Sequence, residues 1–149
     1  MRKIFFTLYI VLAIFPSTTY SETRYKQFPP CTVILEPTKD IPANAKGVVL
    51  IYDIERSFKD KRTSLSVHAL HMPKPSGFGD YNSYEVLAYI PNEISWIFPL
   101  TQYENNNWVG KWDEISSTMR PKHVKVRTIN TKTKRVGPVI LEKKVSCVN

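Results

Sequence analysis

Residues 63–72 read TSLSVHALHM, and the alternation of their side chains decides the fold class. Leu65, Val67 and Ala69 fall on one face of an extended strand, whereas the two serines and the histidine between them fall on the other. Strict alternation of apolar and polar residues is typical of a half-buried β-strand. This stretch therefore predicts a strand with one face turned to a core.

The same period of two recurs on both sides of this stretch. Residues 48–54 begin as a continuous apolar run, and further alternating segments cover 31–36, 84–90, 94–98, 108–112, 124–128 and 139–147. Pro, Gly and Asn clusters separate the segments, helical periodicity is weak, and residues 113–119 allow one helical turn at most. The sequence predicts an all-β, antiparallel immunoglobulin- or fibronectin-like β-sandwich of about seven to eight strands.

The N-terminal residues have the layout of a secretory signal peptide. A basic start (1–3) precedes an uncharged apolar run (4–16) and a small-residue stretch (17–21). A membrane-spanning helix needs about 20 apolar residues, more than this run provides, although an uncleaved anchor is the alternative. We therefore expect a signal peptide over 1–21, an extended lead-in over 22–30 and a single domain over 31–149. After processing we expect no transmembrane segment and a secreted protein, either extracellular or periplasmic.

Two cysteines, Cys31 and Cys147, stand at the two ends of the expected domain. In an exported protein a lone pair of this kind predicts a disulfide bond. Free thiols or a metal site are the alternatives, but neither cysteine has a histidine or second cysteine nearby, and we expect no metal. An even number of alternating strands would bring the two cysteines together, as the geometry of a disulfide requires.

Positive charge is concentrated near the C-terminus. The chain of 149 residues carries 21 Lys and Arg against 13 Asp and Glu, a net charge of +8. Residues 120–144 hold nine of these basic residues and a single acid, Glu142. A basic hairpin of this kind attracts anionic surfaces. The candidate binding residues on it are Lys125, Arg127, Lys132, Lys134, Arg135 and Lys144.

The basic hairpin predicts an anionic partner. Outside the cytoplasm this would be an acidic glycan, an envelope polymer, lipid headgroups or an acidic protein surface, and we expect no nucleic acid. An alternative explanation is that lysines on an exposed edge strand prevent pairing with other chains. A second alternative is an exported inhibitor or accessory subunit that acts on a protein partner.

Aromatic residues give a further candidate site. Trp108 and Trp112 share one face with Gly110 between them, and Trp108 is preceded by residues 105–107, three asparagines. Exposed rings there could stack on sugars while the asparagine amides bond hydroxyls, which makes the chain a candidate carbohydrate-binding module. The alternative is that the tryptophans belong to the core. The core is favoured for Trp96 and Trp112, less strongly for Trp108.

No catalytic constellation is visible in the sequence. His68 and His71 point to opposite faces of one strand and cannot hold an ion together. Asp53 and Glu55 share the solvent side of their predicted strand, but two carboxylates at this spacing are common. Nucleophile and phosphate-binding motifs are missing from the sequence. We expect a non-catalytic protein with no cofactor, and a hydrolase is unlikely on these grounds.

Overall fold

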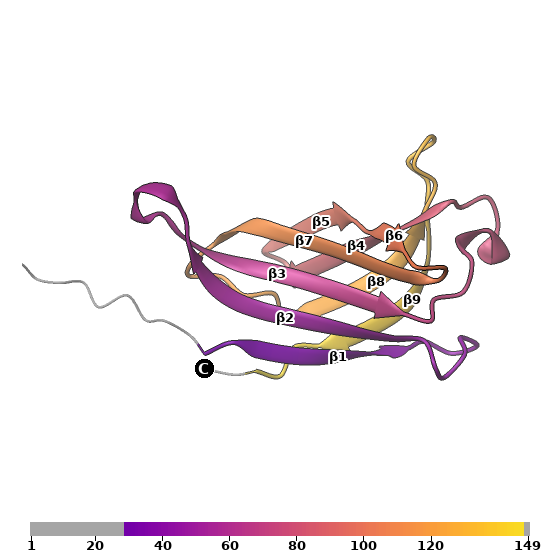
Figure 1. The fold of residues 1–149 in the computed structure, drawn as a ribbon, viewed down its shortest axis with the longest axis horizontal. Helices are drawn as coiled ribbons and strands as arrows, with labels where there is room; N and C mark the ends of the chain where they lie inside the picture. The colour runs from indigo at the N-terminus through magenta and orange to yellow at the C-terminus, as the bar shows by residue number, and fades with distance from the viewer. Residues whose placement is uncertain (1–28, 148–149) are drawn as a thin grey trace, which may run out of the picture.

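The computed structural model describes residues 29–147, which form an all-β structure (Figure 1). The signal peptide predicted over 1–21 and most of the lead-in lie outside the described residues. Within them are nine strands, β1 (Cys31–Pro37), β2 (Lys46–Glu55), β3 (Lys61–Leu70), β4 (Ser83–Ile90), β5 (Ile94–Pro99), β6 (Thr101–Tyr103), β7 (Asn107–Ser116), β8 (His123–Ile129) and β9 (Val136–Lys144). Short 3-10 turns cover Ser57–Lys59 and Pro75–Phe78. In the described part of the chain no helix is long and apolar enough to cross a membrane.

All the strand pairs are antiparallel and form one sheet in the order β5-β4-β8-β9-β1-β2-β3-β7-β6. The two end strands, β5 and β6, are consecutive in the chain and separated by Leu100 alone. The sheet must therefore curl until its two ends meet, and it forms a nearly closed barrel (Figure 1).

A glycine allows the two ends of the sheet to approach. The pairing of β5 with β4 ends at Pro99, and the pairing of β6 with β7 begins at Thr101. Between these two residues the chain passes directly over Gly110. A Cβ atom at Gly110 would lie 2.7 Å from both Leu100 Cδ2 and the Pro99 carbonyl oxygen. Gly110 therefore provides the space in which the chain crosses from one end of the sheet to the other.

The core follows the predicted alternation. Along β4 every second residue is buried, and the same is true of the first half of β2 and of most of β8. The largest fully buried side chain is Tyr84, whose hydroxyl donates a hydrogen bond of 2.7 Å to the Pro73 carbonyl. One exception is β9, where the register shifts and the neighbours Ile140 and Leu141 are both buried.

The predicted disulfide is confirmed. Cys31 and Cys147 are bonded, with their Cα atoms 5.7 Å apart. β1 pairs with β9 through Glu36 and Glu142, and that register, continued toward the start of β1, brings the two cysteines opposite each other. The first half of β1 pairs instead with β2, so the disulfide joins β1 and the segment after β9 where backbone pairing between them has ended.

The structure confirms an all-β, antiparallel class closed by one disulfide, with the nine strands arranged in a nearly barrel-shaped sheet. All eight predicted segments contain a strand, and β6 is the ninth. β5 and β6 are separated by one residue and act as one long segment. The chain therefore still runs through eight long segments, an even number, which brings the two cysteines together. Residues 113–119, which allowed one helical turn at most, contain no helix, since β7 extends to Ser116 and a turn follows it.

Candidate functional site

The basic hairpin consists of β8, β9 and the connecting residues 130–135. Lys125 and Arg127 point outward from β8, as predicted, but each has an acidic partner. Lys125 forms an ion pair of 3.1 Å with Glu142, and Arg127 one of 2.7 Å with Glu85. The hydrogen bond with Glu142 raises the pKa of Lys125. Arg127 is the less available of the two, because it and Glu85 are both largely buried.

The tip of the hairpin holds Lys132, Lys134 and Arg135, all exposed as predicted. The turn is organised by Asn130, whose side-chain oxygen accepts hydrogen bonds from the backbone N–H groups of residues 132 and 133. The guanidinium of Arg135 lies 5.6 Å from the ring centre of Tyr81. Within residues 29–147 neither tip lysine forms an ion pair.

The base of the hairpin combines cations with stacked aromatic rings. His123 lies opposite both Tyr89 and Lys144 in the strand register. The rings of Tyr89 and His123 stack, with centroids 5.0 Å apart and planes 15° from parallel. The Lys125 ammonium lies 5.9 Å from the centre of the Tyr89 ring. We define the basic face as Tyr89, His123, Lys125, Lys143 and Lys144.

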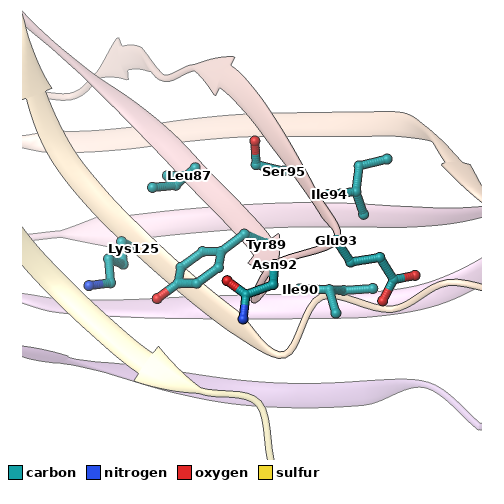
Figure 2. A pocket seen from close by; sticks show the side chains of 8 residues that line it. All are labelled: Leu87, Tyr89, Ile90, Asn92, Glu93, Ile94, Ser95 and Lys125. Carbon is teal, nitrogen blue, oxygen red and sulfur yellow. The ribbon is translucent and has the colours of Figure 1, made fainter.

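Two shallow hollows adjoin at the basic face. One, of about 570 Å³, is lined by all five residues of the face together with Glu36, Pro37, Thr38 and Glu142. The other, of about 500 Å³, lies toward β5 and shares Tyr89 and Lys125. Figure 2 shows the second hollow, in which the Tyr89 ring extends toward Lys125 while Leu87 and Ile94 supply apolar walls. An extended ligand could therefore contact Tyr89 from both hollows.

The acidic groups that line the first hollow, Glu36 and Glu142, are already occupied. Glu36 forms an ion pair with Lys46, and this hydrogen bond lowers the pKa of Glu36. Glu142 is paired with Lys125. Lys143 and Lys144 form no ion pair within the described chain, so they retain charge for a ligand.

Sequence reasoning identified Lys125 and Lys144 but missed the Tyr89–His123 stack. The alternation along residues 84–90 places Tyr89 on the outward side. This was the signal in the sequence that its ring is open to a ligand. The pairing of β4 with β8 is needed to place Tyr89 beside His123, and no local pattern reveals it.

The tryptophans belong to the core, and the prediction of Trp108 as an open stacking platform is wrong. Trp108 is 6% exposed and packs edge-on against Tyr84, with ring centroids 5.1 Å apart. Trp112 stacks on Phe98, and Trp96 is buried. The inner face of β7 is covered by the opposite wall of the barrel, which accounts for this burial.

Trp108 nevertheless reaches a third hollow, of about 660 Å³. Asn105 and Asn106 line it as well, so the structure brings together three of the four residues that the sequence grouped. Asn107 is used elsewhere, since its side-chain oxygen accepts a hydrogen bond from the backbone N–H of His71.

A polar network covers the outer face of β2, β3 and β7. The buried Ser64 hydroxyl donates a 2.5 Å hydrogen bond to Asp113, which also pairs with Lys111 at 3.0 Å. Hydrogen bonds with Ser64 and Ser66 lower the pKa of Tyr52. Ser64 donates its hydroxyl proton in a hydrogen bond to a carboxylate and is buried, so it is not available to a ligand. The network is therefore a structural hydrogen-bond cluster on the outer face of the sheet.

Of the two carboxylates expected on the solvent side, Glu55 is exposed but Asp53 is not. Asp53 continues the inward row of β2 and is nearly buried, forming an ion pair of 3.3 Å with Arg120. His68 packs edge-on against Tyr103 on the outer face, and His71 lies in the loop after β3 with a φ of 53°. Among the described residues no group of three or more His, Cys, Asp or Glu side chains could hold a metal ion.

The structure defines the class of protein as a small, antiparallel all-β domain closed by one disulfide. Residues 27–149 match the family described as "SPbeta prophage-derived uncharacterized protein YoqH", and the chain belongs to this family. A protein of Bacillus subtilis (strain 168) with the same description is 45% identical over an alignment of 123 residues that covers 79% of this chain and 82% of the relative. No solved structure matches the chain.

Proposed function

We propose that this protein is a non-catalytic binding module that engages an anionic polymer, such as an acidic glycan or an envelope polymer, through the basic face. The observation that carries the proposal is the stacked Tyr89–His123 pair, flanked by Lys125 and Lys144 over adjoining hollows. Ammonium groups attract phosphate, sulfate or carboxylate, while aromatic rings contact the apolar parts of a polymer repeat.

The position of β8 in the sheet supports binding over edge protection. Lysines that prevent unwanted pairing are found on edge strands. β8 pairs with β4 and β9 along its length and is an inner strand, whereas β9 pairs with β1 only through Leu141 and Glu142. The edges of the sheet are β5 and β6. Edge protection therefore does not explain Lys125 and Arg127, which lie on β8.

The distribution of free cations favours a long ligand over a single small anion. Lys143 and Lys144 lie at one end of the hairpin, and Lys132 and Lys134 lie at the other. The seven residues of β8 separate the two groups by about 20 Å at about 3.3 Å per residue. A polymer with repeated charges can contact both groups, with the hollowed basic face as its principal site.

Export and an immunoglobulin-like architecture are part of this proposal. The disulfide suits an oxidising compartment, and the apolar run of residues 4–16 suits a signal peptide. The curled antiparallel sheet, with alternating inward residues on its strands, is the basis for proposing an immunoglobulin-like relationship.

The test compares two double charge reversals of equal size. Lys143→Glu with Lys144→Glu changes the basic face, and Lys132→Glu with Lys134→Glu changes the tip. We expect the first pair to weaken binding to immobilised heparin and to polyphosphate by about tenfold, and the second pair to have a clearly smaller effect. The salt concentration of elution and the dissociation constant at fixed low salt measure the difference.

Two outcomes would overturn the proposal. If the unmodified protein is not retained on either polyanion at low salt, the domain has no affinity for this class of ligand. If both double variants lose affinity equally, attraction is set by net charge and the basic face is not a site. Circular dichroism of each variant confirms that folding is preserved.

A further inference from the structure

The third hollow lies apart from the basic face, among the loops around the start of β7. It is formed by the segment after β3, by the start of β4, by β6 and by the β6–β7 turn. We call it the amide pocket; its lining residues used below are Met72, Ser76, Gln102, Asn105, Asn106 and Trp108.

The floor of the amide pocket is apolar and rigid. Met72 and Trp108 are both buried, and Pro73 and Pro75 also contribute to the wall. Tyr84 fixes this floor from beneath, because its ring packs against Trp108 while its hydroxyl bonds the Pro73 carbonyl. The backbone N–H of Met72 donates a 2.8 Å hydrogen bond to the Asn106 carbonyl and so joins the two loops.

The rim of the amide pocket is polar and almost uncharged. Exposed amides and a hydroxyl surround the opening, and Lys74 is the one charged residue that lines it. The Gln102 amide is used to bond the Asn105 carbonyl. Within residues 29–147 the side chains of Ser76, Asn105 and Asn106 have no hydrogen-bond partner, so they can serve a ligand.

We propose that the amide pocket binds a neutral carbohydrate. An apolar floor with a few polar groups on the rim is the usual construction of a small-molecule site. The C–H faces of a sugar ring suit the half-buried Pro73 and Pro75 and the small exposed part of Trp108, and each amide can both donate to and accept from sugar hydroxyls. No carboxylate lines the pocket and Lys74 is its one charged residue, so most of the polar contacts it offers a ligand come from neutral amides and a hydroxyl.

This site is independent of the basic face. The amide pocket and the two hollows at the basic face share no lining residue. Reversing Lys143 and Lys144 therefore leaves the amide pocket unchanged, and blocking the pocket leaves the basic face unchanged. The two binding activities can be lost separately.

The experiment is a titration of the isotope-labelled protein with maltotetraose and with the tetramer of N-acetylglucosamine, followed by NMR. We expect at least one of them to cause saturable shifts at the Trp108 indole and at the Asn105 and Asn106 amides, with a dissociation constant of about 1 mM. Asn106→Ala removes a rim amide but keeps the backbone carbonyl that bonds Met72, and we expect binding at least about fivefold weaker.

Further variants separate the pocket from general effects. Asn105 has a φ of 45° and is left unchanged, because substitution there strains the turn. Ser76 is exposed, so Ser76→Trp can fill the opening from outside the core and should abolish the shifts. The double variant Lys143→Glu and Lys144→Glu should bind the tetrasaccharide as the unmodified protein does. The proposal is overturned if neither sugar gives saturable shifts, or if Ser76→Trp leaves the shifts intact.

Discussion

Asp113 is the residue at which three polar groups of the outer β2–β3–β7 face converge. Ser64 and Lys111 both donate hydrogen bonds to it, and Arg56 adds a more distant positive charge. Partial burial tends to raise the pKa of Asp113, but these donors together outweigh it, so the pKa in the folded protein is lowered. The ionised carboxylate therefore holds the buried Ser64 hydroxyl in place.

Replacing Asp113 should change the acid sensitivity of the fold. Because the pKa is lower in the folded state, the ionised carboxylate stabilises the protein above about pH 4, the ordinary value, and this contribution disappears as the pH falls through the folded-state value. Asp113→Asn should lower the free energy of unfolding by about 1 kcal/mol at pH 7 and by almost nothing near pH 2. Urea denaturation of both proteins across this pH range measures the difference, and a pH-independent difference contradicts the role assigned to the charge.

At the scale of elements, the crossing from β5 to β6 determines whether the sheet can close. Pro99 and Leu100 pass over β7 at Gly110, where no side chain fits. β7 therefore has a gap in its inner row between Trp108 and Trp112, and the crossing chain occupies it.

A methyl group at this crossing should be costly. Gly110→Ala places a Cβ atom 2.7 Å from a backbone carbonyl oxygen that cannot rotate away, so the free energy of unfolding should fall by about 1–3 kcal/mol. Gly77→Ala is the matched control, because a Cβ there meets nothing within 4 Å, and we expect a change within about 0.5 kcal/mol. Equal thermal stability of the two variants would mean that the crossing tolerates displacement.

The sequence predicts elements well where their periodicity is local. Residues 63–72 alternate without interruption, and β3 is found there with its apolar face inward. β6 was missed because a strand of three residues has no measurable period. Trp108 was kept as a candidate surface residue because its neighbours at 105–107 are polar, although the turn ends before the strand enters the core.

The candidate site required pairings between distant strands, which no pattern along the chain contains. Lys125 and Arg127 were placed correctly on the outward face of β8. The acidic residues that pair with them lie on β9 and β4, and only the sheet order identifies these neighbours. The charge of the hairpin was therefore predictable, whereas the portion of it available to a ligand was not.

For the whole molecule, strand order and disulfide position are linked. β1 pairs with β2 along its first half and with β9 at its end, so it connects the two halves of the sheet. Near Cys31 its pairing with β9 has ended, and the disulfide takes its place. The basic face includes the end of β9, and so it depends on this connection.

Removing the disulfide should weaken the whole fold. The bond joins residues 116 apart in sequence, and a crosslink of this length restricts the unfolded chain enough to stabilise the folded state by about 4–5 kcal/mol in the chain-entropy estimate. The double variant Cys31→Ser and Cys147→Ser should lose up to that amount in urea denaturation, with the transition remaining a single step because one core spans the sheet. Unmodified protein in a strong reductant is the matched control and should show the same midpoint. A loss below about 1 kcal/mol would mean that the pairing of β1 with β2 already holds the N-terminal strand.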